Sequence, residues 1–312
     1  MISAIMLGLF LALMLSGFPV SIAIMLATIV GMLIGGYELL AVPQFMAAAT
    51  KSSFLLAIPF FILAANMMNA LGITQRIFNF ATAIAGGLRG GLAQVNVVAS
   101  MIFAGISGAA VADAAGLGTI EIKAMKDGGY SLDFAAAVTL ASATIGPIIP
   151  PSVMMLIYAI QADVSPAAMF LAGILPGCLI GLILMITIYF QVALGYQDCP
   201  PPIKFSMQRL IKTSKDGILS LLAPLIILWG MVSGVVTPTE AGVLAVFYSL
   251  LLGVIYRSFN WLVIRRALVD TVKTSSLILY IIAVSSVMSW VMVNEGTAND
   301  IAEWLGNITE NP

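Results

Sequence analysis

The chain has 312 residues, of which 61% are hydrophobic and 9% are charged, and its formal net charge is -1. Soluble globular domains carry roughly a quarter of charged residues, so this composition excludes a soluble protein and predicts an all-α polytopic membrane protein that lies in a lipid bilayer. No basic run with interleaved aromatic residues occurs in the sequence, and we therefore expect no nucleic acid as a partner.

Apolar segments of about 20 residues, the length that crosses the hydrocarbon layer, follow one another along the chain. The predicted spans are 1–17, 18–39, 52–70, 133–161, 166–194, 217–236, 238–256 and 274–293. The first segment lacks the basic start and the small-residue cleavage site of a signal peptide, so we interpret it as a spanning helix. In residues 73–88 the apolar residues recur at helical spacing, and polar residues lie elsewhere around the turn. This pattern indicates a helix at the membrane interface.

Backbone breakers interrupt two of the apolar segments. Gly105 and Gly108 divide residues 92–126 into halves of about 15 residues, each roughly 22 Å long and too short to span the membrane. We therefore predict a re-entrant hairpin with its tip at these glycines. The span at 133–161 is expected to be a broken helix, because prolines remove backbone donors and clash with the preceding turn. Its prolines are Pro147, Pro150 and Pro151.

Irregular backbone at bilayer depth is tolerated where it is buried in protein or lines a polar cavity, and such breaks hold ions in secondary transporters. We predict a sodium site between the hairpin tip and the broken helix, because hard cations prefer oxygen ligands. The expected sodium ligands are Gly105, Ser107, Thr144, Gly146 and Ile149. The expected substrate pathway contains Asn66, Asp113, Ser142, Pro150 and Ser152.

Two of these residues have a second interpretation. An ionisable residue inside a membrane hairpin is usually functional, but Asp113 could instead cap the second half of the hairpin near its N-terminus, and the structural role is slightly favoured. Asn66 could line the pathway or form a hydrogen bond between helices. For the interrupted segments themselves, Gly105 and Gly108 alone could mark close helix packing, and the prolines alone could mark a kink.

The distribution of basic residues predicts the topology. With a re-entrant hairpin, every lysine and arginine except Lys51 falls in segments on one side of the membrane. The positive-inside rule makes that side the cytoplasm. The N-terminus is then periplasmic.

An internal repeat predicts the domain organisation. Pro19 and Pro238 each open a helix that leads to a similar motif, Lys51-Ser52-Ser53 in one case and Lys273-Thr274-Ser275 in the other. Because the two copies would run in opposite directions, they indicate an inverted repeat. We expect a first repeat at 1–195, a basic cytoplasmic linker at 196–216 and an incomplete second repeat at 217–312. The second repeat ends before any counterpart of the hairpin, so the chain is expected to be truncated at its C-terminus and unable to transport alone.

Several motifs occur together in one order. They are Asn96, Ser100, FAGISG at 103–108, ADAAGLG at 112–118, SATIGPIIPPS at 142–152 and VTPTEAG at 236–242. This set resembles the large membrane subunit of tripartite ATP-independent periplasmic (TRAP) transporters. The likeness covers the whole chain, but Ala109 stands where that family usually has a serine.

The resemblance implies an elevator-type transporter with inverted repeats in the bacterial inner (cytoplasmic) membrane. It implies import of small carboxylates, such as C4-dicarboxylates, sialic acid or similar sugar acids, driven by sodium ions. It also implies two protein partners, a small membrane subunit and a periplasmic substrate-binding protein.

Two other functions compete with this one. A passive channel for ions or solutes also uses interrupted helices. The residues Gly105 to Gly108 match the serine motif of intramembrane proteases, but such a serine needs a base, and the chain contains no histidine. We therefore expect a transporter and not an enzyme.

Overall fold

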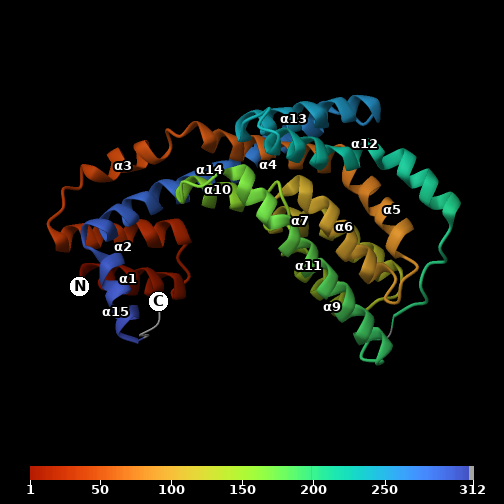
Figure 1. The fold of residues 1–312 in the computed structure, drawn as a ribbon, viewed down its shortest axis with the longest axis horizontal. Helices are drawn as coiled ribbons and strands as arrows, with labels where there is room; N and C mark the ends of the chain where they lie inside the picture. Colours follow the sequence, from red (N-terminus) through yellow and green to blue (C-terminus); the bar gives the residue numbers. More distant parts are fainter. Residues whose placement is uncertain (198, 309–312) are drawn as a thin grey trace. The chain divides into compact units, whose positions relative to one another are not determined.

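The computed structural model describes residues 1–197 and 199–308. Every regular element in these ranges is a helix (Figure 1). The predicted class, an all-α polytopic membrane protein, is confirmed. Residues 309–312 of the predicted second repeat lie outside the described residues.

Within the described residues, four helices are long and apolar enough to cross a membrane. They are α11 (Pro166–Ala193), α12 (Met207–Val232), α13 (Pro238–Ile255) and α14 (Trp261–Asn294). The bent pair of α3 (Ala41–Ala49) and α4 (Ala57–Ala70), joined through the short η1 (Ser53–Leu56), adds a fifth span if it crosses as one. The spans predicted at 1–17 and 18–39 form apolar helices of only 14 and 16 residues, α1 (Ile2–Leu15) and α2 (Val20–Gly35).

Two helices begin earlier than hydrophobicity alone predicted. α12 begins at Met207, inside the predicted linker at 196–216, because Ser206 accepts a hydrogen bond from the backbone N–H of Arg209 at 3.4 Å and caps the helix. α14 begins at Trp261 and not near 274. Its first turns contain Arg265 and Arg266, and charged residues lower the hydropathy of a segment without preventing it from being helical.

Residues 1–52 and 273–312 form one compact unit. Its core contains Met6, Ile24, Met32, Val42, Val284, Val287, Met288 and Val291. The ring of Phe45 stacks on that of Trp290 with 4.6 Å between the centroids. Tyr37 donates a hydrogen bond from its hydroxyl to Glu295 Oε1 at 2.8 Å, just before α15 (Thr297–Ile308).

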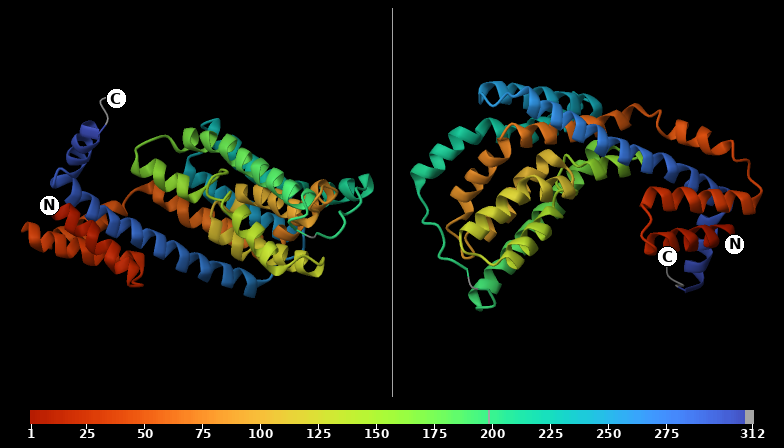
Figure 2. Two further views of the ribbon diagram at one scale, coloured as in Figure 1. Left: turned by 90° about the horizontal axis from the view of Figure 1, so that it is seen from below. Right: turned by 180° about the vertical axis from the view of Figure 1, so that it is seen from behind.

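Residues 53–272 form the second compact unit, which has α6 (Leu92–Ser107) at its centre. One face of α6 packs with α4 and α5 (Ile73–Ala85) through residues such as Val95 and Phe103. The opposite face packs with α9 (Leu132–Ala143) and α11 through Ala93 and Val97. In the ribbon, α4 and α5 are orange, α6 and α9 are in the yellow range and α11 is green (Figure 2). A helix buried on both faces is expected to be largely apolar. α6 is largely apolar, but it also carries the buried polar residues Gln94, Asn96, Ser100 and Ser107.

The segment predicted as a hairpin is a helical hairpin. Gly108 ends α6 with φ of 61°, a left-handed conformation that glycine adopts without a steric penalty. The chain returns through α7 (Ala110–Ala115) and α8 (Leu117–Asp127). The two arms run antiparallel, because Ser100 lies against Glu121 and Asn96 against Met125. Re-entry into the bilayer stays a prediction.

The helix predicted to be broken is interrupted between Ala143, where α9 ends, and Val153, where α10 (Val153–Gln161) begins. Backbone hydrogen bonds of the tight-turn type connect residues 141–149, including one from Ile145 N–H to Ser142 O at 3.0 Å. Pro147 lies within this stretch, Pro150 and Pro151 follow it directly, and the Pro150–Pro151 peptide bond is cis. The division of the chain into two inverted repeats stays a prediction.

Candidate functional site

The hairpin tip and the break of the interrupted helix contact each other. The backbone N–H of Val153 donates a hydrogen bond to the carbonyl oxygen of Gly108 at 3.2 Å. A Cβ atom added to Gly108 would lie 3.0 Å from Ser152 Cα, and one added to Gly105 would lie 3.5 Å from the carbonyl oxygen of Pro150. The two irregular segments therefore contact each other through their backbones. The space between them is too small for a side chain at position 108.

Ser152 holds the break in shape. Its hydroxyl donates to the carbonyl oxygen of Pro147 at 2.6 Å and accepts from the backbone N–H of Met155 at 3.2 Å. The second interaction is an N-cap of α10. Because Ser152 is 1% exposed and both bonds are local, its position indicates a structural role beside the predicted pathway role.

Asp113 is the acidic side chain at this junction. It is 2% exposed, and its Oδ1 accepts a hydrogen bond from the hydroxyl of Ser107. Its Oδ2 is buried and has no hydrogen-bond partner in the described part of the chain. A Cβ atom added to Gly146 would collide with this Oδ2, so the free oxygen lies directly against the break. The carboxylate accepts from a side chain and not from the backbone N–H groups that a helix cap would use.

Behind the tip, buried polar side chains connect α6, α8 and α9. The amide of Asn96 donates to Thr139 Oγ1 and accepts from Ser142 Oγ, both at 2.7 Å. Ser100 Oγ lies 3.0 Å from Ser142 Oγ and 3.5 Å from Glu121 Oε1. All five side chains are buried. Ser142, predicted to line the pathway, therefore lies inside a network that joins the hairpin to α9.

Other predicted residues lie in different surroundings. Thr144 is exposed and donates its hydroxyl to Ala141 O at 2.7 Å, within the last turn of α9. Ile149 is half-buried and packs against α11 at Gly177. Asn66 lies on α4 and donates to Thr271 Oγ1 at 2.9 Å, a bond between helices. The structure thus brings together Gly105, Ser107, Asp113, Gly146 and Pro150, and it places Asn66 elsewhere.

Sequence reasoning did not select Glu121 and Thr139, and it noted Asn96 and Ser100 only through the resemblance. A signal for them was present. Asn96 and Ser100 are four residues apart, and Thr139 and Ser142 are three apart, spacings that place side chains on one face of a helix. Glu121 is an ionisable residue in a predicted membrane segment, which is by itself a reason to consider a function.

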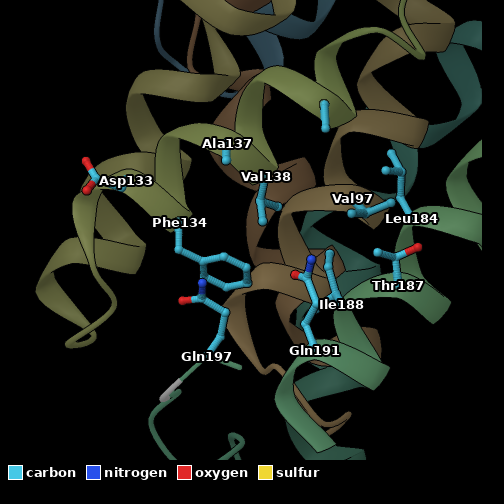
Figure 3. A pocket seen from close by; sticks show the side chains of 11 residues that line it. Val97, Asp133, Phe134, Ala137, Val138, Leu184, Thr187, Ile188, Gln191 and Gln197 are labelled. Carbon is cyan, nitrogen blue, oxygen red and sulfur yellow. The ribbon is translucent and has the colours of Figure 1, made fainter. Parts of the chain in front are cut away.

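A separate cleft of about 420 Å³ lies between α9 and α11. Hydrocarbon side chains such as Phe134, Val138 and Ile188 line most of it, with Gln191 and Gln197 at one end (Figure 3). None of the predicted site residues lines this cleft. Asp133 and Thr187 also line the cleft. The tip junction is the better candidate site, because it contains a buried carboxylate oxygen that has no hydrogen-bond partner within the described residues.

Comparison with known proteins places these features in context. Residues 7–312 match the sequence model of a family described as "Tripartite ATP-independent periplasmic transporter, DctM component". The chain is 41% identical over 271 residues to the sialic acid TRAP transporter large permease protein SiaM of Vibrio cholerae, a match that covers 86% of this chain and 63% of that protein.

Two further relatives have other names. The 2,3-diketo-L-gulonate TRAP transporter large permease protein YiaN of Escherichia coli is 34% identical over 88% of this chain and 65% of its own length. The C4-dicarboxylate TRAP transporter large permease protein DctM of Pseudomonas aeruginosa is 35% identical over 83% of this chain and 60% of its own length. The chain therefore spans less than two thirds of the length of these three relatives.

Proposed function

Because the chain belongs to the family of DctM components of tripartite ATP-independent periplasmic transporters, and is thus a large membrane subunit of this type, we propose that it carries the ion and substrate pathway of a sodium-driven importer. The proposed substrates are small carboxylates. Relatives are named for sialic acid, 2,3-diketo-L-gulonate and C4-dicarboxylates, which share a carboxylate group. Membership makes the chain a transporter component and not an enzyme.

The proposal includes the surroundings of the chain. We propose the bacterial inner membrane as its location, with the N-terminus in the periplasm. The proposed partners are a small membrane subunit and a periplasmic binding protein that delivers the carboxylate. We propose that the hairpin and the interrupted helix move together as part of an elevator-type transport domain, because they contact each other backbone to backbone at Gly108 and Val153.

The observation that carries the sodium assignment is the free Oδ2 of Asp113. A buried carboxylate without a compensating charge costs several kcal/mol, and no ion pair joins Asp113 to a basic side chain within the described residues. A cation bound at the junction would supply the missing charge. Sodium fits the ligands available there, because they are all oxygens: the Asp113 carboxylate, the Ser107 hydroxyl and backbone carbonyls of the tip and the break.

This arrangement assigns a role to each residue. Ser107 donates to Oδ1 of Asp113 and thereby orients the carboxylate. Gly146 leaves room for Oδ2. Gly108 and Val153 hold the two irregular segments together. A bound sodium ion would then stabilise the contact between the hairpin and the interrupted helix, and this coupling is what sodium-driven transport requires.

Replacing Asp113 by asparagine tests the proposal. We expect the full-length gene product carrying Asp113→Asn to lose sodium-dependent thermal stabilisation, which the wild type should show with sodium and not with potassium, because ligands that bind the folded state raise its unfolding temperature. Sodium-driven uptake of sialic acid, succinate and 2,3-diketo-L-gulonate into proteoliposomes containing the partner subunits should fall at least tenfold.

The matched control is Asp133→Asn, which removes the same charge from an exposed position in the first turn of α9. It should keep the sodium effect. If Asp113→Asn and Ser107→Ala both retained the full sodium-dependent stabilisation, the sodium assignment would be wrong. Uptake that never exceeds the outside concentration of substrate would favour a passive channel over a coupled importer.

A further inference from the structure

A polar pocket lies where the end of α4 meets the first turns of α14. It has a volume of about 190 Å³. Its lining residues are Asn66, Asn69, Ala70, Val263, Arg266, Ala267 and Asp270. None of them belongs to the hairpin tip or to the break, so the pocket is separate from the proposed sodium site.

The pocket presents one positive and one negative side chain. Arg266 and Asp270 are four residues apart on α14 and therefore lie on one face of the helix. Both are exposed, and no ion pair joins them within the described residues. Each charge is thus available for a ligand that carries the opposite charge.

The two asparagines add one donor and one acceptor. Asn66 uses its amide nitrogen to donate to Thr271 Oγ1 at 2.9 Å, which leaves its carbonyl oxygen as an acceptor. Asn69 uses its carbonyl oxygen to accept from Thr74 Oγ1 at 3.1 Å, which leaves its amide N–H groups as donors. The lining as a whole suits a small group that contains both an anion and a cation.

The residues near the pocket on α14 are of the kinds found at a membrane surface. Trp261, at the start of α14, is 70% exposed, and exposed tryptophan and arginine are typical of the interface between lipid and water. Further along α14, Val269 and Val272 are exposed apolar residues. A membrane helix presents such side chains to acyl chains, so a ligand in this pocket can have its polar end at Arg266 and hydrocarbon beside α14.

We propose that this pocket binds the zwitterionic headgroup of phosphatidylethanolamine. The phosphate interacts with the guanidinium of Arg266 and the amide N–H groups of Asn69, since charge-assisted hydrogen bonds to phosphate are the strong ones. The ammonium interacts with the carboxylate of Asp270 and the carbonyl oxygen of Asn66. A purely anionic headgroup would leave Asp270 without a cation, and a quaternary ammonium has no N–H to donate.

Competition between lipids tests this proposal. The full-length gene product is incubated with equal amounts of phosphatidylethanolamine, phosphatidylglycerol and phosphatidylcholine of identical acyl chains, and the lipids it retains are measured by native mass spectrometry. We expect phosphatidylethanolamine to be retained about tenfold over each of the others, which corresponds to about 1.4 kcal/mol. Soluble glycerophosphoethanolamine should compete only weakly, because it lacks acyl chains.

Charge variants separate the two halves of the site. Arg266→Gln should abolish the preference for phosphatidylethanolamine, and Asp270→Asn should shift the preference to phosphatidylglycerol. The control is Arg265→Gln, which removes the same charge from the neighbouring residue outside the pocket. Asn69→Ala, a change at an exposed position, provides a second variant that leaves both charges in place and should weaken retention.

Three results would overturn the proposal. They are equal retention of the three lipids by the wild type, an equal loss in Arg265→Gln and Arg266→Gln, and equally tight binding of glycerophosphoethanolamine and the lipid. The second would indicate general attraction to basic residues near the membrane. The third would indicate a soluble zwitterion as the ligand.

Discussion

Gly146 and Asp113 depend on each other. The free carboxylate oxygen of Asp113 lies where a side chain at position 146 would be. Glycine is therefore required at this position for steric reasons, and not for a left-handed backbone, since Gly146 is absent from the glycines with positive φ. At the scale of single residues, the absence of a side chain at Gly146 leaves the space that the Asp113 carboxyl group occupies.

Replacing Gly146 by alanine should disturb this pair. Overpacking of a filled interior costs about 1–3 kcal/mol, so we expect Gly146→Ala to lower the unfolding temperature and to weaken sodium-dependent stabilisation. Gly217→Ala on α12 is the control, because the nearest atom to its added Cβ would be Arg76 O at 3.8 Å, an ordinary contact. Thermal unfolding of both purified variants, with sodium or potassium, is the measurement. Equal effects of the two substitutions would argue against steric coupling to Asp113.

The amide of Asn96 makes two of the hydrogen bonds that connect α6 to α9. Asn96 is 0% exposed and bonds to side chains on α9 through both its donor and its acceptor. Removing a buried partner costs about 1–3 kcal/mol, although bonds between membrane helices average only about 0.6 kcal/mol. At the scale of elements, this network and the apolar faces of α6 together fix the hairpin against α9.

We expect Asn96→Ala to destabilise the protein by about 1–2 kcal/mol, because it leaves Thr139 and Ser142 without their shared partner. The measurement is the free energy of unfolding from a denaturant titration in mixed micelles. Asn79→Ala is the control, since Asn79 is exposed and accepts a hydrogen bond from Gln75 at 3.1 Å on its own helix. A double-mutant cycle with Ser142→Ala should give a coupling energy of at least about 0.5 kcal/mol. Strict additivity would contradict a shared network.

Much of this architecture could be predicted from composition and from breakers of regular structure. Apolar length gave the helices, and Gly108 and Pro150 marked the tip and the break, because glycine and proline act on the local backbone whatever surrounds them. The starts of α12 and α14 could not be predicted this way, since polar first turns such as those around Arg265 lower hydropathy.

The site was predictable only in part. The small and irregular residues at the junction were selected from their local chemistry, but Glu121 and Thr139 were not, because their role depends on which helices pack together. Asn66 was selected as a polar residue in an apolar span, yet its hydrogen-bond partner is Thr271, on a helix that is far away in the sequence. The sequence shows that a polar residue lies in an apolar segment, whereas only the fold shows which residue it bonds to.

At the scale of the whole molecule, the described helices belong to two compact units, and α14 contributes residues to both. Each unit has its own apolar core, around Met6 and Val287 in one and around α6 in the other. The distribution of basic residues constrains both units together. Every lysine and arginine must lie outside the hydrocarbon layer or be compensated within it.

This distribution predicts on which side each loop lies. Arg89 and Lys126 flank the hairpin, so they face the same side of the membrane if the hairpin is re-entrant and opposite sides if it spans. We expect both to face the cytoplasm, because basic residues remain on that side, and Lys51 to face the periplasm. The test uses single cysteines at these three positions in a protein whose Cys178 and Cys199 are replaced by serine. All three positions are exposed in the structure.

In intact spheroplasts, a membrane-impermeant maleimide should label Lys51→Cys and leave Arg89→Cys and Lys126→Cys unlabelled. After permeabilisation, all three should react, which controls for access to the thiols. Labelling of only one of the two flanking positions from outside would mean that the hairpin spans the membrane, and the predicted sodium site would then lack the re-entrant tip on which it is built. Labelling of both from outside, with Lys51→Cys protected, would instead mean that the orientation is the inverse of the predicted one. Nearly all of the basic residues would then violate the positive-inside rule.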